Sequence, residues 1–230
     1  MLIYLDVETT GLEKEDKICS IAVLKEDEYF YDLVNESKKI PPLASSINNI
    51  TNEMIKDKPP LKESRAFKEL SKASDDDILV AHNIDFDLNM LINSGFTCKS
   101  KIIDTLRVSR HLIPELESYT LNFLRYELKL YKKEEQIKRI LNLEINICPH
   151  NALSDVIITK LLLDELLELD SLENIIKLSN KPVLLSKFEF GKYSGRYIEE
   201  ISMIDKGYLN WMLSLEDIDE DLRYTLEYYL

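Results

Sequence analysis

Glycine, cysteine and histidine are scarce in this chain of 230 residues, which contains five glycines, three cysteines and three histidines. The cysteines lie far apart and form no pair with the spacing of metal ligands, which disfavours a zinc site. They are instead expected to be buried thiols in a reducing cytoplasm. The three positions are Cys19, Cys98 and Cys148.

Long apolar runs are also missing. The stretch Ile157–Leu169 is rich in leucine and isoleucine, but charged residues interrupt it, so it is too polar to span a bilayer. The first residues, MLIYLD, have the pattern of a strand and lack a basic leader or a small-residue cleavage site. These features predict a cytoplasmic protein without a signal peptide and without a membrane partner.

Positive charge is in deficit, because 29 lysines and arginines face 42 aspartates and glutamates and the net charge is −13. This balance disfavours a protein that coats nucleic acid, since such proteins carry a basic surface. It remains compatible with a nuclease that acts on a chain end, because a local footprint is enough and bound metals cancel part of the acidic charge. The charge then predicts weak, metal-dependent and salt-sensitive binding.

The expected elements come as strands first, then alternating strands and helices, then helices. This order indicates an α/β fold with a mixed sheet flanked by helices. Hydrophobic patterning predicts strands at Leu2–Val7, Ile18–Leu24, Tyr29–Val34, Ile78–Ala81 and Lys101–Ile103. It predicts helices at Leu61–Ala73, Phe86–Asn93 and Ala152–Leu169, with at most one short helix between residues 42 and 59 and an N-cap at Asp104.

Composition changes near residue 181, because three of the five glycines lie in the last part of the chain. Phe188–Ile198 has the pattern of a hairpin with glycine turns, and short helices are expected at Tyr208–Leu213 and Leu222–Tyr229. We therefore expect a large domain over residues 1–180 and a small α+β domain over residues 181–230.

Three short clusters of polar residues lie where elements begin or end. The first is DVETTG at residues 6–11. Residues i and i+2 of a strand point to the same face, so Asp6 and Glu8 place two carboxylates side by side. Buried together without a cation, they would repel each other and one would be protonated. A solvated strand edge is the alternative, and the apolar neighbours Leu5 and Val7 disfavour it.

The second cluster, HNIDFD at residues 82–87, follows the strand Ile78–Ala81. A strand-to-helix turn is the usual position of active-site residues in open α/β sheets. Asp87 lies one turn into the helix and can face a cleft, whereas Asp85 is expected to cap the helix. For His82 and Asn83, turn and capping hydrogen bonds are at least as well supported as a catalytic role.

The third cluster, HNALSD at residues 150–155, opens the helix Ala152–Leu169. His150 lies at the mouth of the helix and Asp155 a little over one turn later, so both can point at one site. Alone this pattern is weak, because a histidine at a helix start is more often a surface or capping residue. The remaining histidine, His111, has no acidic motif nearby and is expected to be structural.

Taken together, the clusters indicate metal-dependent phosphodiester chemistry. Carboxylate oxygens without cysteine favour Mg²⁺ or Mn²⁺ over zinc. Two such ions roughly 4 Å apart can activate a water and stabilise the leaving oxygen of a phosphodiester. A neutral histidine is suited to accept the proton of that water.

The three clusters, in this order, resemble the sequence motifs of the DEDDh exonucleases, whose five-stranded sheet is RNase H-like. The resemblance implies two divalent metal ions, Mg²⁺ or Mn²⁺, bound by Asp6, Glu8, Asp87 and Asp155, with His150 as the general base. It also implies that five residues contact the terminal nucleotide, namely Thr9, Gly11, Leu12, Asn83 and Phe86. Among them, Leu12 would act as an apolar wedge. Asn48 and Asn49 stand where this family commonly has His-Gly, which leaves the role of that loop open.

TLNFLRYELKL at residues 120–130 and the tail FEFGKYSGRYIEEI, followed by GYLNWML, resemble exonuclease X and its small C-terminal domain. This resemblance implies 3′→5′ hydrolysis at the 3′ ends of single- or double-stranded DNA. An exoribonuclease of the same superfamily is the alternative enzyme, because discrimination rests on contacts to the 2′-OH. A non-catalytic nucleic-acid or polymerase-binding module is disfavoured, since all five catalytic positions hold competent residues, and no motif indicates a polymerase partner.

Two groups of basic residues stay outside these motifs. In the insert 131–148 a solvated amphipathic helix is favoured over contact with a DNA backbone. In the tail, phosphate binding and a plain surface role remain equally open for Lys187, Lys192 and Arg196. The neighbouring aromatic residues are expected to form the core of the small domain, namely Phe188, Phe190, Tyr208 and Trp211.

Overall fold

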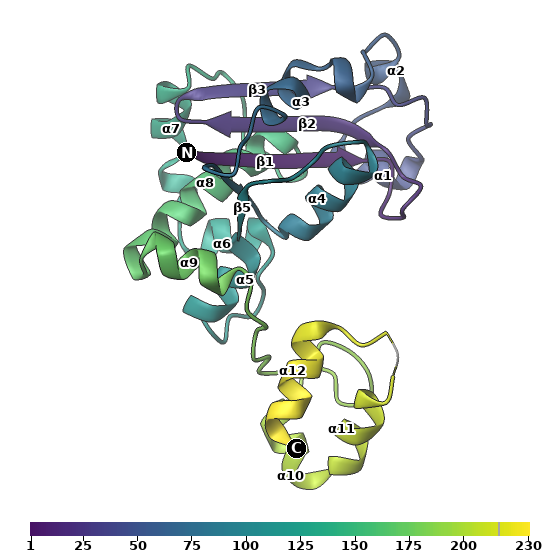
Figure 1. Ribbon diagram of the computed structural model, residues 1–230, viewed down its shortest axis with the longest axis vertical. Helices are drawn as coiled ribbons and strands as arrows, with labels where there is room; N and C mark the ends of the chain where they lie inside the picture. Colours follow the sequence, from purple (N-terminus) through teal and green to yellow (C-terminus); the bar gives the residue numbers. More distant parts are fainter. Residues whose placement is uncertain (216) are drawn as a thin grey trace.

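The computed structural model describes residues 1–215 and 217–230 (Figure 1). Five strands form one sheet in the order β3-β2-β1-β4-β5, in which β1 pairs antiparallel with β2 and parallel with β4. The predicted mixed five-stranded sheet is therefore confirmed. Its strands are β1 (Leu2–Thr9), β2 (Ile18–Lys25), β3 (Glu28–Leu33), β4 (Ile78–Ala81) and β5 (Lys101–Asp104).

Helices surround the sheet and form the end of the chain. Those before the last strand are α1 (Pro42–Asn48), α2 (Asn52–Ile55), the 3₁₀ helix η1 (Leu61–Glu63), α3 (Arg65–Leu70) and α4 (Ile84–Asn93). Those after it are α5 (Thr105–Leu112), α6 (Leu121–Glu127), η2 (Leu130–Lys132), α7 (Glu134–Ile140), α8 (Ala152–Leu169), α9 (Leu172–Leu178), α10 (Ile198–Ile204), α11 (Lys206–Leu213) and α12 (Glu220–Tyr229). Among the described residues, no helix combines the length and apolarity that crossing a membrane requires.

Two expectations for the segment between β3 and β4 were wrong. Residues 42–59 hold two short helices, α1 and α2, instead of at most one. The long helix expected at Leu61–Ala73 is divided because Ser64 adopts an extended conformation and its hydroxyl caps α3 by accepting a hydrogen bond from the amide of Phe67.

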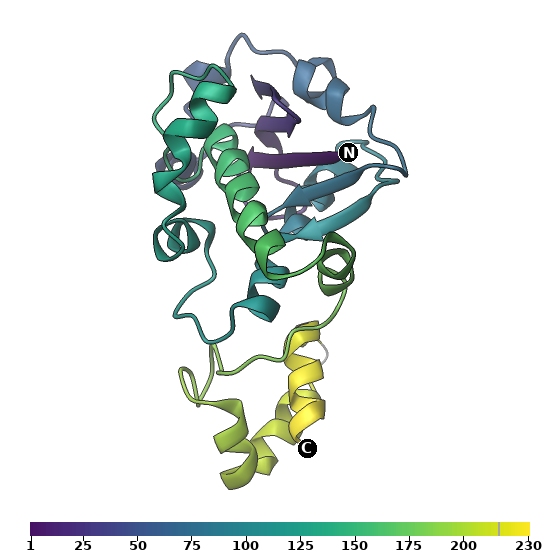
Figure 2. The same cartoon turned by 90° about the vertical axis from the view of Figure 1, so that its left-hand side faces the viewer.

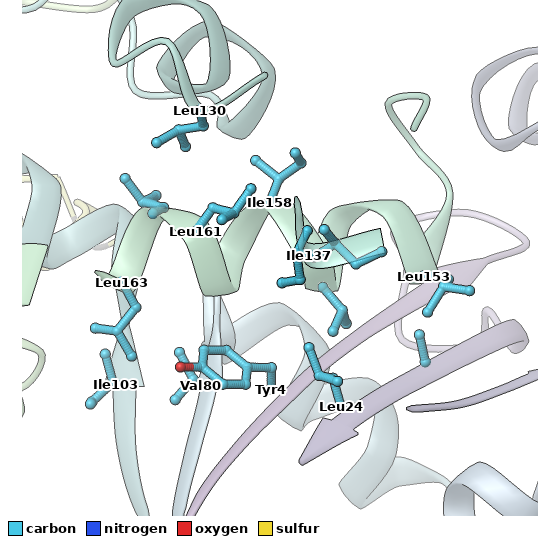
Figure 3. Packing of buried hydrophobic residues seen from close by; sticks show 14 of the residues in the cluster. Tyr4, Leu24, Val80, Ile103, Leu130, Ile137, Leu153, Ile158, Leu161 and Leu163 are labelled. Atoms are coloured by element: carbon cyan, nitrogen blue, oxygen red, sulfur yellow. The ribbon is translucent and has the colours of Figure 1, made fainter. Parts of the chain in front are cut away.

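The side chains of β1 alternate between two hydrophobic cores. Tyr4 belongs to the core under α8, whereas Ile3, Leu5 and Val7 belong to the core under α3 and α4. Figure 2 shows α8 lying across β1 on one face of the sheet. In Figure 3, Tyr4, Leu24, Val80 and Ile103 of four strands lie on the side of α8 opposite Leu130. Because α8 is buried on both sides, its N-terminus has a fixed position beside β1.

The last part of the chain has a core of its own, which is separate from the two cores of the sheet. It gathers Phe188 with residues of the three final helices: Ile198, Ile201, Leu209, Met212, Leu222 and Leu226. The predicted hairpin is a tight loop closed by one bridge between Lys187 and Tyr197, and Gly191 and Gly195 both have positive φ there. Helix α10 was not expected, because the hairpin pattern was taken to run as far as Ile198.

Some side-chain placements differ from the expectations. Phe188 is buried, but Phe190 and Trp211 are 58% and 55% exposed, so they are not part of the small core. Cys19 is buried, whereas Cys148 is exposed on the loop before α8, so the expectation of three buried thiols was wrong. In the insert, α7 buries Ile137, as an amphipathic helix should.

Candidate active site

Three carboxylates converge where β1 meets the start of α8. Asp6 and Glu8 continue the row of β1 side chains that faces α8, and Asp155 lies in the first turn of that helix. One ligand oxygen from each of the three lies within 4.8 Å of the others. The i and i+2 spacing on the strand and the burial of α8 together produce this cluster.

Asp87 approaches the same place from α4. It is only 3% exposed, and its Oδ1 accepts a hydrogen bond of 2.9 Å from the amide nitrogen of Val7, between the two β1 carboxylates. Pairing with β4 stops at Tyr4, so Val7 has no strand partner on that side. Asp87 therefore satisfies a buried backbone donor, and α4 is tied to β1 at the site.

The electrostatics of this cluster are unfavourable without a cation. Burial, followed by the charges of Asp87, Asp155 and Glu8, raises the pKa of Asp6 well above its usual value. Burial and the charge of Asp155 raise the pKa of Glu8 to about 8. Burial raises the pKa of Asp155 to about 7, against the opposing backbone amides of His150 and Asn151 and the charge of Arg125.

Burial also raises the pKa of Asp87 well above its usual value, against the hydrogen bond from Val7. A divalent cation among these groups would relieve both the repulsion and the desolvation. The donor set consists of oxygens alone, which suits Mg²⁺ or Mn²⁺. These residues therefore fit the predicted metal ions.

His150 lies on the loop that leads into α8 and lines the same cleft as the carboxylates. Its backbone is left-handed, with φ of 56°, and the residue is exposed. The helix cap is the next residue, Asn151, whose Oδ1 accepts from the amide of Ser154. Of the two alternatives for this histidine, the capping role therefore does not apply, whereas the exposure of His150 agrees with a surface residue.

The loop after β1 is built around Asp16. Its carboxylate accepts hydrogen bonds from the hydroxyl of Thr10 at 2.8 Å and from the amide of Glu13 at 2.9 Å. A side chain at position 11 would collide with this carboxylate, which explains why Gly11 is there. The hydroxyl of Thr9 donates to the carbonyl of Gly11 at 2.6 Å. These contacts fix the loop that presents Leu12, whose side chain is 82% exposed.

The structure brings all ten predicted site residues to one cleft of about 1800 Å³. Besides the four carboxylates and His150, its lining includes the residues expected to contact a nucleotide: Thr9, Gly11, Leu12, Asn83 and Phe86. Asn83 is exposed at the start of α4, and Phe86 is half-buried one turn further on.

His82 makes structural hydrogen bonds, which was one of the two alternatives for this residue; the other was a catalytic role. Burial lowers the pKa of its ring to about 4, so the ring is neutral near pH 7. Nε2 lies 2.9 Å from the carbonyl oxygen of Tyr119, and because a carbonyl only accepts, Nε2 carries the proton. Nδ1 lies 3.0 Å from the hydroxyl oxygen of Thr105. His82 thus connects β4 to α5 and to the loop before α6.

The capping role expected for Asp85 was wrong. Asn83 is the N-cap of α4, with a left-handed backbone, and Asp85 is exposed in the first turn. The predicted cap at Asp104 is confirmed, and it does more than expected. Its Oδ1 accepts from the amides of Leu106 and Arg107 in α5, and also from the amide of Asn83. Asp104 therefore aligns the starts of α4 and α5.

Asn48 supports the site, although the sequence left its role open. Asn48 is buried, and its Nδ2 donates to the carbonyl of Thr9 at 3.2 Å, while its Oδ1 accepts from the amide of Ile50. Asn49 has a left-handed backbone, with φ of 59°. The signal was a polar pair at the place where the family commonly has His-Gly, and the glycine position corresponds to this left-handed residue.

Comparison with known proteins places these observations in a family. The Exonuclease family model matches residues 3–163, and the exodeoxyribonuclease X-like C-terminal model matches residues 188–216. Exodeoxyribonuclease 10 of Escherichia coli (strain K12) is 30% identical over 238 aligned positions, which cover 100% of this chain and 99% of that protein. The 3′-5′ exonuclease DinG of Bacillus subtilis (strain 168) is 33% identical over 178 positions, which cover 72% of this chain and 17% of that protein.

Solved structures agree with this fold. Exonuclease X in complex with 5′ overhanging duplex DNA superposes with a TM-score of 0.58 at 25% identity and covers 78% of this chain and 100% of that chain. The nuclease domain of 3′hExo, a DEDDh family member bound to rAMP, superposes with a TM-score of 0.52 at 14% identity and covers 73% of this chain and 92% of that chain.

Proposed function

Because the chain belongs to the exonuclease family, in the DEDDh superfamily of 3′→5′ exonucleases, and is a nuclease, we propose that it hydrolyses the terminal phosphodiesters of DNA from the 3′ end. The products would be nucleoside 5′-monophosphates. The observation that carries this proposal is the convergence of Asp6, Glu8 and Asp155, with Asp87 tied to the same strand.

In this proposal the four carboxylates hold two divalent ions, Mg²⁺ or Mn²⁺. When bound, the ions supply Lewis-acid stabilisation of the attacking and leaving oxygens. Asp6 would be a ligand in this site, since its carboxylate lies in one cluster with those of Glu8 and Asp155. Burial raises the pKa values of Asp6, Glu8 and Asp155, and repulsion by neighbouring carboxylates adds to the shift for Asp6 and Glu8, so the site favours cations of high charge.

His150 is the proposed general base. Its exposure on the cleft wall allows it to accept the proton of the attacking water and to release it to solvent. Asn151 caps α8, so the ring of His150 is not needed for capping.

Leu12, Phe86 and Asn83 are the proposed contacts of the terminal nucleotide. The exposed apolar side chain of Leu12 fits a base or the end of a base pair, because burying it against a base removes apolar surface from water. Thr9 and Gly11 contribute the backbone around which the terminal nucleotide would lie.

DNA is favoured over RNA by the relative of matching length, exodeoxyribonuclease 10, and by the exodeoxyribonuclease X-like tail. An exoribonuclease is the second candidate, because the same carboxylate chemistry serves either polymer. We further propose a division into an exonuclease domain over residues 1–180 and a small domain over residues 181–230, supported by the separate core of the last helices.

The test uses 5′-labelled oligonucleotides with Mg²⁺ or Mn²⁺. Substrates are single-stranded DNA, 3′-recessed duplex DNA and single-stranded RNA of the same sequence. We expect a ladder that shortens from the 3′ end on DNA and disappears with EDTA and in Asp6→Ala. Equal or faster shortening of RNA would replace the DNA proposal with the exoribonuclease. No cleavage of any substrate with either metal would refute the proposed function.

A further inference from the structure

The cleft that holds the carboxylates extends to the C-terminal part of the chain. Its lining includes the segment Val183–Glu189 together with Ser194 and Gly195, which all come from the region that carries the small core. The loop before α6 lines it as well, from Pro114 to Thr120. Substrate at the carboxylates would therefore share one cleft with the C-terminal residues.

Lysine and arginine are rare along this cleft. In the part of the chain that the structure describes, its lining contains one of each, Arg110 on α5 and Lys187 on the C-terminal segment. Acidic side chains are common along the same walls, including Glu13, Asp16, Glu115 and Glu117. In a chain with net charge −13, these two cations are the groups best suited to meet a phosphate inside the cleft.

Arg110 and Lys187 both line the cleft, and the shorter ion pair of Arg110 is with the exposed Glu189, while its Nη1 atom also lies 3.9 Å from Oδ2 of the buried Asp221. The Nη2 atom of Arg110 lies 3.1 Å from a carboxylate oxygen of Glu189, two residues after Lys187. The side chain of Glu189 is 68% exposed, and an exposed ion pair contributes little to stability. A phosphate can therefore replace Glu189 at little cost. The Nζ atom of Lys187 lies 4.6 Å from the ring centre of Tyr197 and is exposed.

Neutral hydrogen-bond donors line the same cleft as these cations. Hydroxyl and amide side chains lie on both walls of the same cleft, and such groups commonly contact nucleic-acid phosphates. They are Ser118, Thr120, Asn122, Ser186 and Ser194.

A second ion pair fixes the C-terminal wall to α5, the helix that carries Arg110. The Nη1 atom of Arg107 lies 2.8 Å from Oδ1 of Asp221 in α12 and donates to the carbonyl of Lys181 at 2.9 Å. The same Asp221 oxygen accepts from the amide of Val183 at 2.9 Å, and Asp221 is buried. The wall thus has a defined position relative to the cleft.

We propose that the C-terminal region forms one wall of the substrate cleft, where Lys187 and Arg110 bind backbone phosphates of the strand whose 3′ end lies at the carboxylates. This inference rests on the proposed function and assigns a polynucleotide longer than the terminal unit as the preferred substrate. Short substrates occupy only the carboxylate end, so they do not reach the two cations.

The test compares the full-length wild type with Lys187→Glu, Arg110→Gln and the matched control Lys206→Glu. Lys206 is an exposed lysine of the same region, at the start of α11 and outside the cleft lining. Each protein is assayed on the p-nitrophenyl ester of thymidine 5′-monophosphate, which reports on the carboxylate end alone, and on a single-stranded DNA 20-mer. Binding of a fluorescent 20-mer with non-hydrolysable 3′-terminal linkages is measured by anisotropy over a range of salt concentrations.

In Lys187→Glu we expect the ratio of kcat/KM on the 20-mer to kcat/KM on the ester to fall about tenfold. The number of phosphate contacts, obtained from the slope of binding affinity against salt concentration, should fall by about one. A smaller fall is expected in Arg110→Gln, and none in Lys206→Glu. The inference is overturned if Lys187→Glu and Lys206→Glu have the same ratio and the same affinity for the 20-mer. A wild type that cleaves neither substrate refutes the proposed function, whereas the anisotropy data still decide whether Lys187 contacts the strand.

Discussion

The two ends of the cleft differ in charge, burial and origin. The carboxylate end, formed by Asp6, Glu8, Asp87 and Asp155, is acidic and is held by β1, α4 and α8, whose other side chains fill the two large cores. The C-terminal end, formed by Arg110, Lys187 and Glu189, carries exposed or half-buried side chains of both signs.

This difference matches two tasks. Groups that must hold metals at fixed distances need rigid support, and buried strands and helices supply it. Groups that follow a polymer backbone act through charge at the surface, where small displacements cost little. Changes at the carboxylate end should therefore abolish chemistry, while changes at the C-terminal end should alter the dependence on substrate length.

The largest effect is expected from Asp6→Asn. Loss of this carboxylate should lower kcat by about 10⁴-fold, because metal ions contribute several kcal/mol of transition-state stabilisation. Asp85→Asn is the matched control, since Asp85 is exposed in the first turn of α4. The measurement is initial rate on the DNA 20-mer with Mg²⁺. Comparable rates in the two variants would contradict the assignment of Asp6.

A smaller loss is expected from His150→Ala. Removing a general base should lower kcat by about 10²-fold and change the pH profile of kcat, because hydroxide at high pH partly replaces the base. His111→Ala is the control, since His111 contacts the carbonyl of Lys181 and not the carboxylates. Turnover close to wild type at neutral pH would show that His150 is not the base.

The pH dependence of stability tests the charge of the carboxylate end. Glu8 and Asp155 have pKa values of about 8 and about 7, above their ordinary values, because burial disfavours their charged forms. In the unfolded chain both are already ionised at pH 6.5, so raising the pH to 8.5 forces ionisation of the folded state alone. In EDTA, the Tm should therefore fall by several degrees across this range.

Metal should reverse that trend, because Mg²⁺ binds the ionised carboxylates and stabilises the folded state. The increase in Tm on adding Mg²⁺ should be larger at pH 8.5 than at pH 6.5, as measured by differential scanning fluorimetry. Glu8→Gln should flatten the pH dependence in EDTA. A wild-type Tm that rises or stays constant from pH 6.5 to 8.5 in EDTA would contradict this account.

The smallest effect on chemistry is expected from Arg107→Gln, which breaks the ion pair that holds the C-terminal wall. The free energy of unfolding should fall by about 1.5–3 kcal/mol, the usual contribution of a hydrogen bond to a charged group, because the buried Asp221 loses its partner at 2.8 Å and keeps only Arg110 at 3.9 Å. Urea unfolding measures this loss, and Arg196→Gln, whose ion pair with Glu200 is exposed, is the control. Equal stability of the two variants would mean that the Arg107–Asp221 pair does not hold the wall.

The parts of the carboxylate end could be predicted from the sequence because the spacing within each motif is local, whereas the meeting of the three motifs at one site was implied by the resemblance to the DEDDh exonucleases. Asp6 and Glu8 share a face through the period of a strand, and Asp155 lies one turn into a helix whose boundaries the apolar pattern defines. The helix predicted at Ala152–Leu169 has these bounds in the structure.

The C-terminal end could not be predicted, because its contacts join distant residues. Arg110 and Glu189 are 79 positions apart, and Arg107 and Asp221 are 114 apart, and no period or spacing links them. For the same reason the sequence assigned Trp211 to the small core, since aromatic composition does not specify which face of a short helix is covered. The cap of α4 was misassigned because it depends on the left-handed backbone of Asn83.

The central claim is that the carboxylate end is a two-metal centre, and counting bound ions tests it most directly. Electron paramagnetic resonance of Mn²⁺, with thymidine 5′-monophosphate present, gives the number of ions bound per chain for the wild type and Asp6→Asn. We expect two ions in the wild type and the loss of at least one in the variant. Absence of bound Mn²⁺ at concentrations that support hydrolysis, or two ions bound as tightly in Asp6→Asn, would contradict the account.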